Sequence, residues 1–390
     1  MDYSKKTRDD LISLCKEQKI KGYSGKKRED LIALLQPVNI VVDDKKDKGQ
    51  FYTTQSSYIL EGFDVPTDAR CIMEPFAGQG DLIDWVKQCS TLPIEAYDIQ
   101  PKRDDIQQRD TLQDPPNYEN AWILTNPPYL ARNKSQNKQL YDQYDTNDLY
   151  KCFLSSVVKQ GNCRGGIVII PSGFFFSSRD LDVRCRHDFM KLYRITKVKF
   201  FEETVFDDTS TTIVAFSFER SSIELTEQNV EWETLPTKEK RVFSMTSANQ
   251  WIVGGEIYRL PVPEGVHIRR HVEGQALKEN EQQTFITLNA LDSGTMDGRI
   301  KLTYQKDYVY PAKDCSRTYA TLRIRGMTLT EEQQVYLCSE FNTYVERKRT
   351  ETWSLFLPQF RESKEYARKR IPFELAYLIL LHLLTFPLPS

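Results

Sequence analysis

Few of the residues that build metal and redox sites occur in this sequence of 390 residues. It has 4 histidines, and its 8 cysteines are scattered without a Cys-x-x-Cys pair. His267-Ile-Arg-Arg-His271 lacks the glutamate of a zinc-peptidase motif, so we expect no metal site and interpret both histidines as surface residues. Scattered cysteines in apolar surroundings are typical of reduced thiols. The sequence therefore predicts an intracellular, reducing compartment such as the cytoplasm.

A long apolar run is also missing. No charged segment followed by an apolar one opens the chain, and the most apolar stretch, residues 375–384, is shorter than the ~20 residues that a membrane-spanning helix needs. We interpret this stretch as a buried C-terminal helix and expect no contact with a membrane. The chain carries 53 Lys and Arg against 55 Asp and Glu, a net charge of -2. Without a global basic field, contact with nucleic acid requires local patches.

Two basic patches lie near the ends of the chain. Residues 1–50 hold twelve Lys and Arg against nine Asp and Glu, a balance of +3, and residues 341–372 hold eight against four, a balance of +4. In the second patch cations alternate with aromatic residues, as on phosphate-contacting surfaces, although salt-bridged helix faces give the same pattern. The candidate DNA-binding residues are Lys21, Lys26, Lys27, Arg347, Arg349, Arg368 and Arg370.

The first patch also has the pattern of a helical hairpin. Residues 9–15 and 28–35 have the apolar spacing of two short helices, and a Gly-Tyr-Ser-Gly loop flanked by lysines joins them. This arrangement resembles the SAP-type module, which is found attached to proteins that handle DNA. The resemblance implies a DNA-binding hairpin over residues 1–38, followed by a charged linker over residues 39–48. A hairpin that only caps the next domain is the alternative.

Short apolar strands alternate with helical segments from residue 49 to residue 220. Such alternation predicts an α/β domain with a mostly parallel, Rossmann-like sheet and helices on both faces. Helices are expected to begin near Asp81 and Asp148. Beyond residue 220 the sequence becomes irregular and rich in turns, which predicts a second domain over residues 221–390. The expected strands are residues 71–74, 94–97, 121–125, 166–170, 195–200 and 212–218.

A glycine-rich turn, Glu74-Pro-Phe-Ala-Gly-Gln-Gly-Asp-Leu82, follows the first expected strand. Gly78 and Gly80 let the backbone approach a ligand closely, although the turn can also be a tight strand-to-helix connection. The third glycine of a dinucleotide fingerprint is missing, because Ile83 occupies its position. Phosphate binding is therefore not implied.

Polar residues follow the next expected strands. Asp98 ends the second strand and can accept both hydroxyls of a ribose, and Asp110, before the third strand, suits an adenine amino group. The third strand ends in Asn126-Pro-Pro-Tyr129. Ligands of open α/β sheets bind at this edge. A rigid turn is the alternative interpretation of the tetrapeptide.

Taken in order, these motifs resemble those of the S-adenosylmethionine-dependent N6-adenine DNA methyltransferases of the gamma arrangement, in which a target-recognition domain follows the catalytic motif. The resemblance also covers Gly165-Gly-Ile-Val-Ile-Ile-Pro171 and Val205-Phe-Asp-Asp208. Thr54 stands where the family often has proline, so Thr53 and Thr54 are alternatives for the contact with the methionine moiety. The resemblance implies these cofactor residues: Thr53, Thr54, Glu74, Pro75, Gly78, Gly80, Asp98, Asp110 and Asn126.

The chemistry of this family explains the tetrapeptide. The lone pair of the adenine amino nitrogen is delocalised into the ring, so hydrogen-bond acceptors must localise the pair and aim it at the methyl group. The Asn126 side-chain oxygen and the Pro127 carbonyl are expected to accept the amino hydrogens, and Pro128 stiffens the backbone. Tyr129 and Phe206 are expected to stack on the two faces of an adenine flipped out of double-stranded DNA.

The sequence thus predicts a site-specific adenine methyltransferase with S-adenosylmethionine as cofactor. The family context implies protection of DNA in restriction-modification, and the hairpin points to a large DNA virus or its host. Methylation of protein glutamine is one rival, because such enzymes also carry an Asn-Pro-Pro-Tyr motif. RNA adenine as substrate and a non-catalytic DNA-binding protein on the same scaffold are two others.

Overall fold

The computed structural model describes residues 6–17, 23, 27–35, 49, 53–206, 211–292, 298–360 and 367–389. The chain divides into two units, Met1–Gly49 and Gln50–Ser390. Within the described ranges, no helix is long and apolar enough to cross a membrane, and no group of three or more His, Cys, Asp or Glu side chains is placed to hold a metal ion. All 8 cysteines are free thiols.

The first unit contains the two predicted helices, α1 (Arg8–Glu17) and α2 (Arg28–Leu35). Thr7 and Asp10 cap α1 reciprocally: the Asp10 N–H donates to Thr7 Oγ1 at 3.3 Å, and the Thr7 N–H donates to Asp10 Oδ2 at 3.1 Å. The buried side chains between the helices are Leu11, Cys15, Leu31 and Leu35. This small core explains why the segment folds as a hairpin; its DNA-binding role stays a prediction.

The second unit is built on a nine-stranded sheet with the order β3-β2-β1-β4-β5-β7-β6-β8-β9. Strands β3, β2, β1, β4 and β5 are parallel, and the chain runs outward in opposite directions from β1 and β4. This is the Rossmann order, with its topological switch point between β1 and β4. The bounds are β1 (Cys71–Glu74), β2 (Ile94–Asp98), β3 (Gln107–Gln108), β4 (Ala121–Thr125), β5 (Gly165–Pro171), β6 (Tyr193–Phe201), β7 (Ile213–Arg220), β8 (Glu227–Leu235) and β9 (Glu239–Thr246).

All six predicted strands are present, and the predicted α/β class is confirmed. The sheet is mixed, because β7 is inserted antiparallel between β5 and β6. It also continues past residue 220, where β8 pairs in parallel with β6 and β9 pairs antiparallel with β8. The predicted domain boundary therefore falls inside the sheet.

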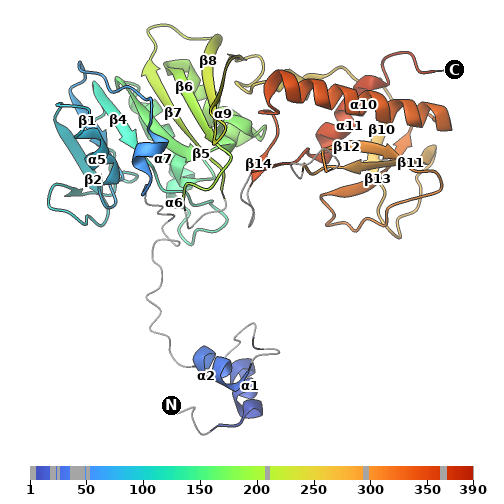
Figure 1. Ribbon diagram of the computed structural model, residues 1–390, viewed down its shortest axis with the longest axis horizontal. Coiled ribbons are helices and arrows are strands. Elements are labelled where there is room, and N and C mark those ends of the chain that lie inside the picture. The colour runs from blue at the N-terminus through green and yellow to red at the C-terminus, as the bar shows by residue number, and fades with distance from the viewer. Residues whose placement is uncertain are drawn as a thin grey trace. The chain divides into compact units, whose positions relative to one another are not determined.

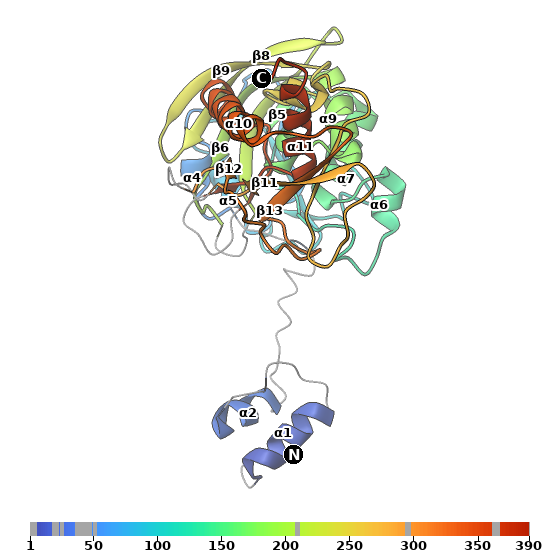
Figure 2. The ribbon, with the colours of Figure 1, turned by 90° about the vertical axis from the view of Figure 1, so that its right-hand side faces the viewer.

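Helices cover both faces of this sheet. Figure 2 shows α7 (Leu149–Gln160) and α9 (Asp180–Leu192) on one side and α4 (Ser56–Ile59) and α5 (Asp81–Val86) on the other. Both helix starts that the sequence predicts are confirmed, because α5 begins at Asp81 and Asp148 is the N-cap of α7. Two short helices lie beside α7 and α9: α6 (Gln139–Tyr144) packs against α7, and α8 (Gly173–Phe176) packs against α9.

A second hydrophobic core lies beyond the large sheet. Figure 1 shows α10 (Glu331–Thr352) and α11 (Phe373–Leu383) on one face of a four-stranded sheet with the order β10-β13-β11-β12. The buried side chains of α11 include Leu375, Ala376, Ile379 and Leu380, which confirms the predicted buried C-terminal helix. The remaining elements are η1 (Gly255–Arg259), β10 (His267–Arg270), β11 (Glu281–Asn289), β12 (Lys301–Tyr304), β13 (Tyr319–Arg325), β14 (Gln359–Phe360) and β15 (Arg368–Lys369).

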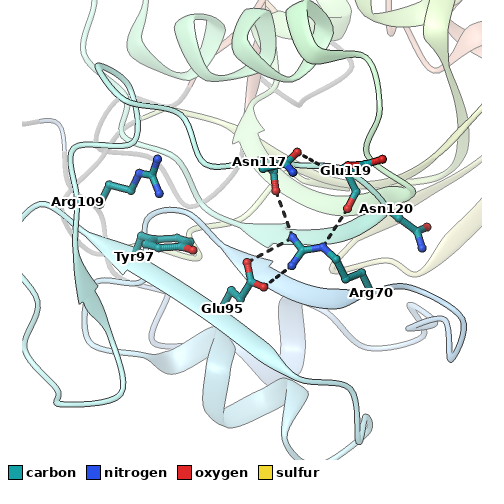
Figure 3. Close-up of a pocket in the computed structure, with 7 residues that line it drawn as sticks. All are labelled: Arg70, Glu95, Tyr97, Arg109, Asn117, Glu119 and Asn120. Carbon is teal, nitrogen blue, oxygen red and sulfur yellow. Dashed lines mark hydrogen bonds and ion pairs between the residues drawn. The ribbon is translucent and has the colours of Figure 1, made fainter.

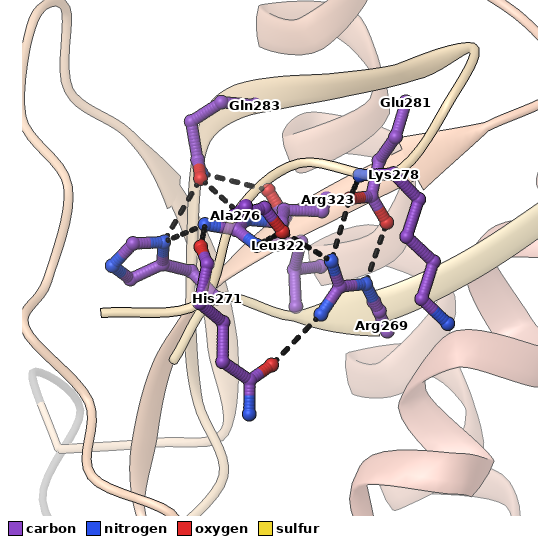
Figure 4. Close-up of polar contacts among 9 residues, drawn as sticks. Arg269, His271, Ala276, Lys278, Glu281, Gln283, Leu322 and Arg323 are labelled. Carbon is purple, nitrogen blue, oxygen red and sulfur yellow. Dashed lines mark hydrogen bonds and ion pairs between the residues drawn. The ribbon is translucent and has the colours of Figure 1, made fainter. Parts of the chain in front are cut away.

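The other face of the four-stranded sheet is polar (Figure 4). Buried Arg323 donates to His271 Nδ1 at 2.8 Å and to Gln283 Oε1 at 2.8 Å, and Arg269 forms a two-point ion pair with Glu281. Partial burial and the neighbouring Arg323 guanidinium lower the pKa of His271. His271, which is partly exposed, thus takes part in a side-chain hydrogen-bond network, and His267 is exposed, as the sequence suggested.

Candidate functional site

Three polar side chains from separate sequence motifs meet at one edge of the large sheet. Glu74 ends β1, Asp98 ends β2, and Asn126 follows β4. Because β1 pairs in parallel with both β2 and β4, these three ends are neighbours. The edge lies at the switch point, where open α/β sheets bind their ligands.

Glu74 is fully buried at this edge, with one of its carboxylate oxygens satisfied and the other not. Its Oε1 accepts from the Phe76 N–H at 3.0 Å and from Thr125 Oγ1 at 2.5 Å. No described residue bonds to its Oε2. Burial, reinforced by the charge of Asp98 and opposed by the two hydrogen bonds, raises the pKa of Glu74 to about 8. A buried acceptor without a partner is costly, so this site favours a bound cation or donor.

Asp98 holds the glycine-rich turn through hydrogen bonds to the backbone. Its carboxylate accepts the Gly78 N–H at 2.9 Å and the Gln100 N–H at 2.8 Å. Gly78 and Gly80 have φ values of 53° and 90°, which favour glycine. The φ of Gly80 is one that residues with a Cβ rarely adopt, so the turn depends on glycine at this position.

Asp110 and Ile99 border the same edge. Asp110 Oδ1 accepts the N–H groups of Leu112 and Gln113, both at 3.2 Å, and Thr111 Oγ1 donates to the Pro75 carbonyl at 2.9 Å. Ile99 directly follows Asp98 and remains 42% exposed. Ile99 is not among the cofactor residues predicted from the sequence. The signal that could have found it is an apolar residue immediately after an acid at a strand end.

Asn126 is held by two hydroxyl groups. Its Nδ2 donates to Thr53 Oγ1 at 3.1 Å, and the Tyr129 hydroxyl lies within hydrogen-bond reach of both Asn126 Oδ1 and the Ile169 carbonyl, the latter at 2.7 Å. Asn126, Thr53 and Tyr129 are all buried, whereas Thr54 is exposed. Complete burial raises the pKa of Tyr129 well above its ordinary value, so its hydroxyl keeps its proton.

The two predicted stacking residues are packed inside the protein. Tyr129 contacts Tyr150 edge-on with a centroid distance of 6.3 Å, and Phe206 belongs to the main hydrophobic core. Pro127 is buried and Pro128 is partly buried. The stacking of Tyr129 and Phe206 on a flipped base stays a prediction.

The predicted DNA-binding cations differ in their surroundings. Arg349 forms ion pairs with Asp292 at 2.5 Å and with Glu346 at 3.2 Å, which leaves its guanidinium engaged inside the protein. Arg347 pairs weakly with Glu351 at 3.9 Å and is exposed. Arg368 and Arg370 are partly buried, and Lys27 is exposed. Lys21 and Lys26 lie outside the described residues.

A second set of cations was missed by the sequence reasoning. In the segment from β12 to β13, Lys313 and Arg317 are exposed, and no described acidic side chain pairs with either. Tyr308 and Tyr319 in the same segment are 39% and 43% exposed. Arg270 holds the segment by donating to the Asp314 and Ser316 carbonyls. Alternating tyrosines and cations over residues 301–319 are the signal that could have found this surface.

An open pocket of about 500 Å³ lies away from the candidate site (Figure 3). Two of the residues that line it, Arg70 and Asn120, precede β1 and β4, so it lies toward the amino ends of those strands. The Arg70 guanidinium donates to Glu95 and to the Asn117 and Glu119 carbonyls. Because these contacts occupy the guanidinium, Arg70 has a structural role here: it connects the loop before β4 to β2.

Comparisons with known proteins give weak structural similarities. No family model and no curated protein matches the chain. A modification subunit assigned to a type I restriction enzyme of Vibrio vulnificus YJ016 is 17% identical, with a TM-score of 0.39, over 60% of this chain and 54% of that one. The methyltransferase subunit of a type I restriction-modification system from Streptococcus thermophilus is 16% identical, with a TM-score of 0.36, over 48% of each chain. The chain thus spans about half the length of these structures.

Proposed function

We propose that this protein is an S-adenosylmethionine-dependent DNA methyltransferase that modifies the N6 amino group of adenine. The observation that carries the proposal is the position of Asn126-Pro-Pro-Tyr129 at the carboxyl end of β4, beside Glu74 and Asp98. An amide and two carboxylates at a topological switch point suit a nucleoside cofactor next to an amino-group acceptor.

The residues present fit the cofactor. Glu74 Oε2 is buried without a partner among the described residues, and an ammonium group such as that of the methionine moiety would satisfy it. Asp98 uses one lone pair of each oxygen for a backbone N–H, so each oxygen can still accept a ribose hydroxyl. The exposed side chain of Ile99 offers an apolar surface to the adenine ring. When bound, S-adenosylmethionine supplies a methyl group on a positively charged sulfur.

The chain's own residues would then prepare the target nitrogen. Asn126 Oδ1 and the Pro127 carbonyl each accept one hydrogen of the adenine amino group, which favours a pyramidal nitrogen with a localised lone pair. The buried position of Asn126 excludes water that would compete for these hydrogen bonds. Holding the nitrogen close to the methyl group supplies the rest of the rate increase.

Duplex DNA is the proposed substrate, because exposed cations and aromatic side chains lie together on the segment between β12 and β13. Lys313 and Arg317 can contact phosphates without first breaking an internal ion pair. Tyr308 and Tyr319 offer planar surfaces beside them. The resemblance to the gamma-arrangement methyltransferases supports a role in protecting DNA within a restriction-modification setting.

The testing experiment is methylation of a random duplex DNA library with tritiated S-adenosylmethionine, followed by mapping of N6-methyladenine. We expect label in DNA at adenines within one short sequence. Protein and RNA fractions should be labelled in parallel reactions. Label that appears only in protein glutamine or only in RNA would refute the DNA assignment, and no transfer to any acceptor would refute the catalytic one.

A further inference from the structure

The carboxamide of Asn126 is enclosed by hydroxyl groups on both sides. Thr53 comes from the segment before α4, and Tyr129 comes from the loop after β4. Thr53 Oγ1 accepts from Asn126 Nδ2 at 3.1 Å, and the Tyr129 hydroxyl lies within hydrogen-bond reach of Asn126 Oδ1 and of the Ile169 carbonyl. All three side chains are buried, so water does not replace either contact.

We propose that Thr53 and Tyr129 are positioning residues whose hydroxyl groups set the orientation of the Asn126 carboxamide. This inference rests on the proposed function, in which Asn126 Oδ1 accepts a hydrogen from the target amino group. It assigns Thr53 to the catalytic asparagine rather than to the cofactor. It also assigns two roles to Tyr129: its hydroxyl orients Asn126, and its ring is predicted to stack on the flipped adenine.

The orientation of a carboxamide matters because its two ends have similar shapes and opposite hydrogen-bonding roles. An acceptor oxygen attracts an amino hydrogen, whereas an NH₂ group in the same place presents a donor to a donor. A rotation of Asn126 by 180° would require Thr53 to donate and Tyr129 to accept. Tyr129 has one proton, which would then go to the Ile169 carbonyl at 2.7 Å. Both hydroxyls must therefore reverse their roles together, and losing either one removes the coupling.

The distinguishing experiment measures single-turnover methyl transfer by the full chain to mixed-sequence genomic DNA at saturating cofactor. Thr53→Val should lower this rate about tenfold, the scale of one lost buried hydrogen bond, and leave the dissociation constant of S-adenosylmethionine within about twofold. Thr53→Ser should restore the rate to within about threefold. Tyr129→Phe, which keeps the ring, should also lower the rate about tenfold.

A double-mutant cycle separates positioning from general stability. If Thr53 acts through Asn126, Thr53→Val should cause no further loss in an Asn126→Ala background. Thr146→Val is the matched control, because it removes another buried hydroxyl, one that contacts Cys152 at 3.1 Å. It should lower the melting temperature comparably and leave the rate within about twofold.

Three results would overturn the inference while the proposed function stands. They are a weaker cofactor affinity of Thr53→Val with an intact saturated rate, multiplicative losses in the double mutant, and a Thr53→Ser rate as low as that of Thr53→Val. Absence of methyl transfer by the wild-type chain to DNA would instead refute the proposed function.

Discussion

Protonation of Glu74 should make cofactor binding depend on pH. Its pKa is raised to about 8 by burial, so the carboxyl is mostly neutral at pH 6, whereas pairing with the cofactor's ammonium group requires the carboxylate. Each pH unit below the pKa then lowers the affinity about tenfold, which corresponds to about 1.4 kcal/mol. We expect the association constant to rise about tenfold from pH 6 to pH 7. Above pH ~8 it should fall again, because the α-amino group of the ligand loses its own proton.

Isothermal titration calorimetry measures this linkage in two ways. Between pH 6 and pH 7, binding should release about one proton, which is detected by comparing buffers with different ionisation enthalpies. Glu74→Gln should weaken binding at pH 8 and abolish both the proton release and the rise in affinity. Glu95→Gln is the matched control, because Glu95 on the neighbouring strand pairs with Arg70 instead. It should retain the wild-type pH profile.

The raised pKa of Glu74 also affects the stability of the cofactor-free protein. The folded state holds the Glu74 proton more tightly than the unfolded state, whose carboxyl ionises near its ordinary pKa of 4.5. Stability should therefore fall as pH rises from about 4.5 to about 8, and Glu74→Gln should remove this part of the pH dependence. A wild-type affinity that is flat between pH 6 and pH 7, without proton release, would contradict the reasoning.

Three further outcomes are expected. Asn126→Ala should lower the single-turnover rate by roughly two orders of magnitude with little change in cofactor affinity, as measured by rapid quench and calorimetry. Asp98→Ala should weaken S-adenosylmethionine binding by about 1.5–3 kcal/mol in calorimetry, and an unchanged affinity would place the ribose elsewhere. Replacing Lys313 and Arg317 with alanine should reduce the slope of log affinity against log salt by about 1.8 in DNA-binding titrations. Lys240→Ala, which removes an exposed lysine of β9, is the control and should leave the slope unchanged. If the double variant and the control give the same slope, the surface around Lys313 and Arg317 does not bind DNA.

The edge of the sheet that carries the candidate site could be predicted because its signals are local. Strands β1 and β4 are continuous apolar runs; Glu74 ends the first and Asn126 directly follows the second, and parallel pairing brings these ends together. The sequence did not reveal that the sheet continues past residue 220. Strand β9 begins with four exposed residues, so it lacks the continuous apolar run that marks the central strands of the sheet.

Contacts between residues far apart in the sequence explain the other differences between the predicted and the observed surroundings of the site residues. The sequence shows Arg349 as one cation in a basic run, but its partner Asp292 lies 57 positions earlier. Whether a cation faces solvent or an internal acid depends on such tertiary pairing, which periodicity does not encode. The bonds of Thr53 and Tyr129 to Asn126 likewise join segments that only folding brings together.

The insertion of β7 between β5 and β6 has a consequence for biosynthesis. Strand β5, Gly-Gly-Ile-Val-Ile-Ile-Pro, leaves the ribosome well before β7, which supplies its neighbour through all seven residues from Gly165 to Pro171. Until residue 220 has emerged, the nascent chain therefore carries an apolar strand with one unpaired edge, a segment prone to intermolecular β-pairing. Fragments that stop before residue 211 should aggregate even though they contain Glu74, Asp98 and Asn126. Expression of this protein should depend on chaperone protection during that interval of translation.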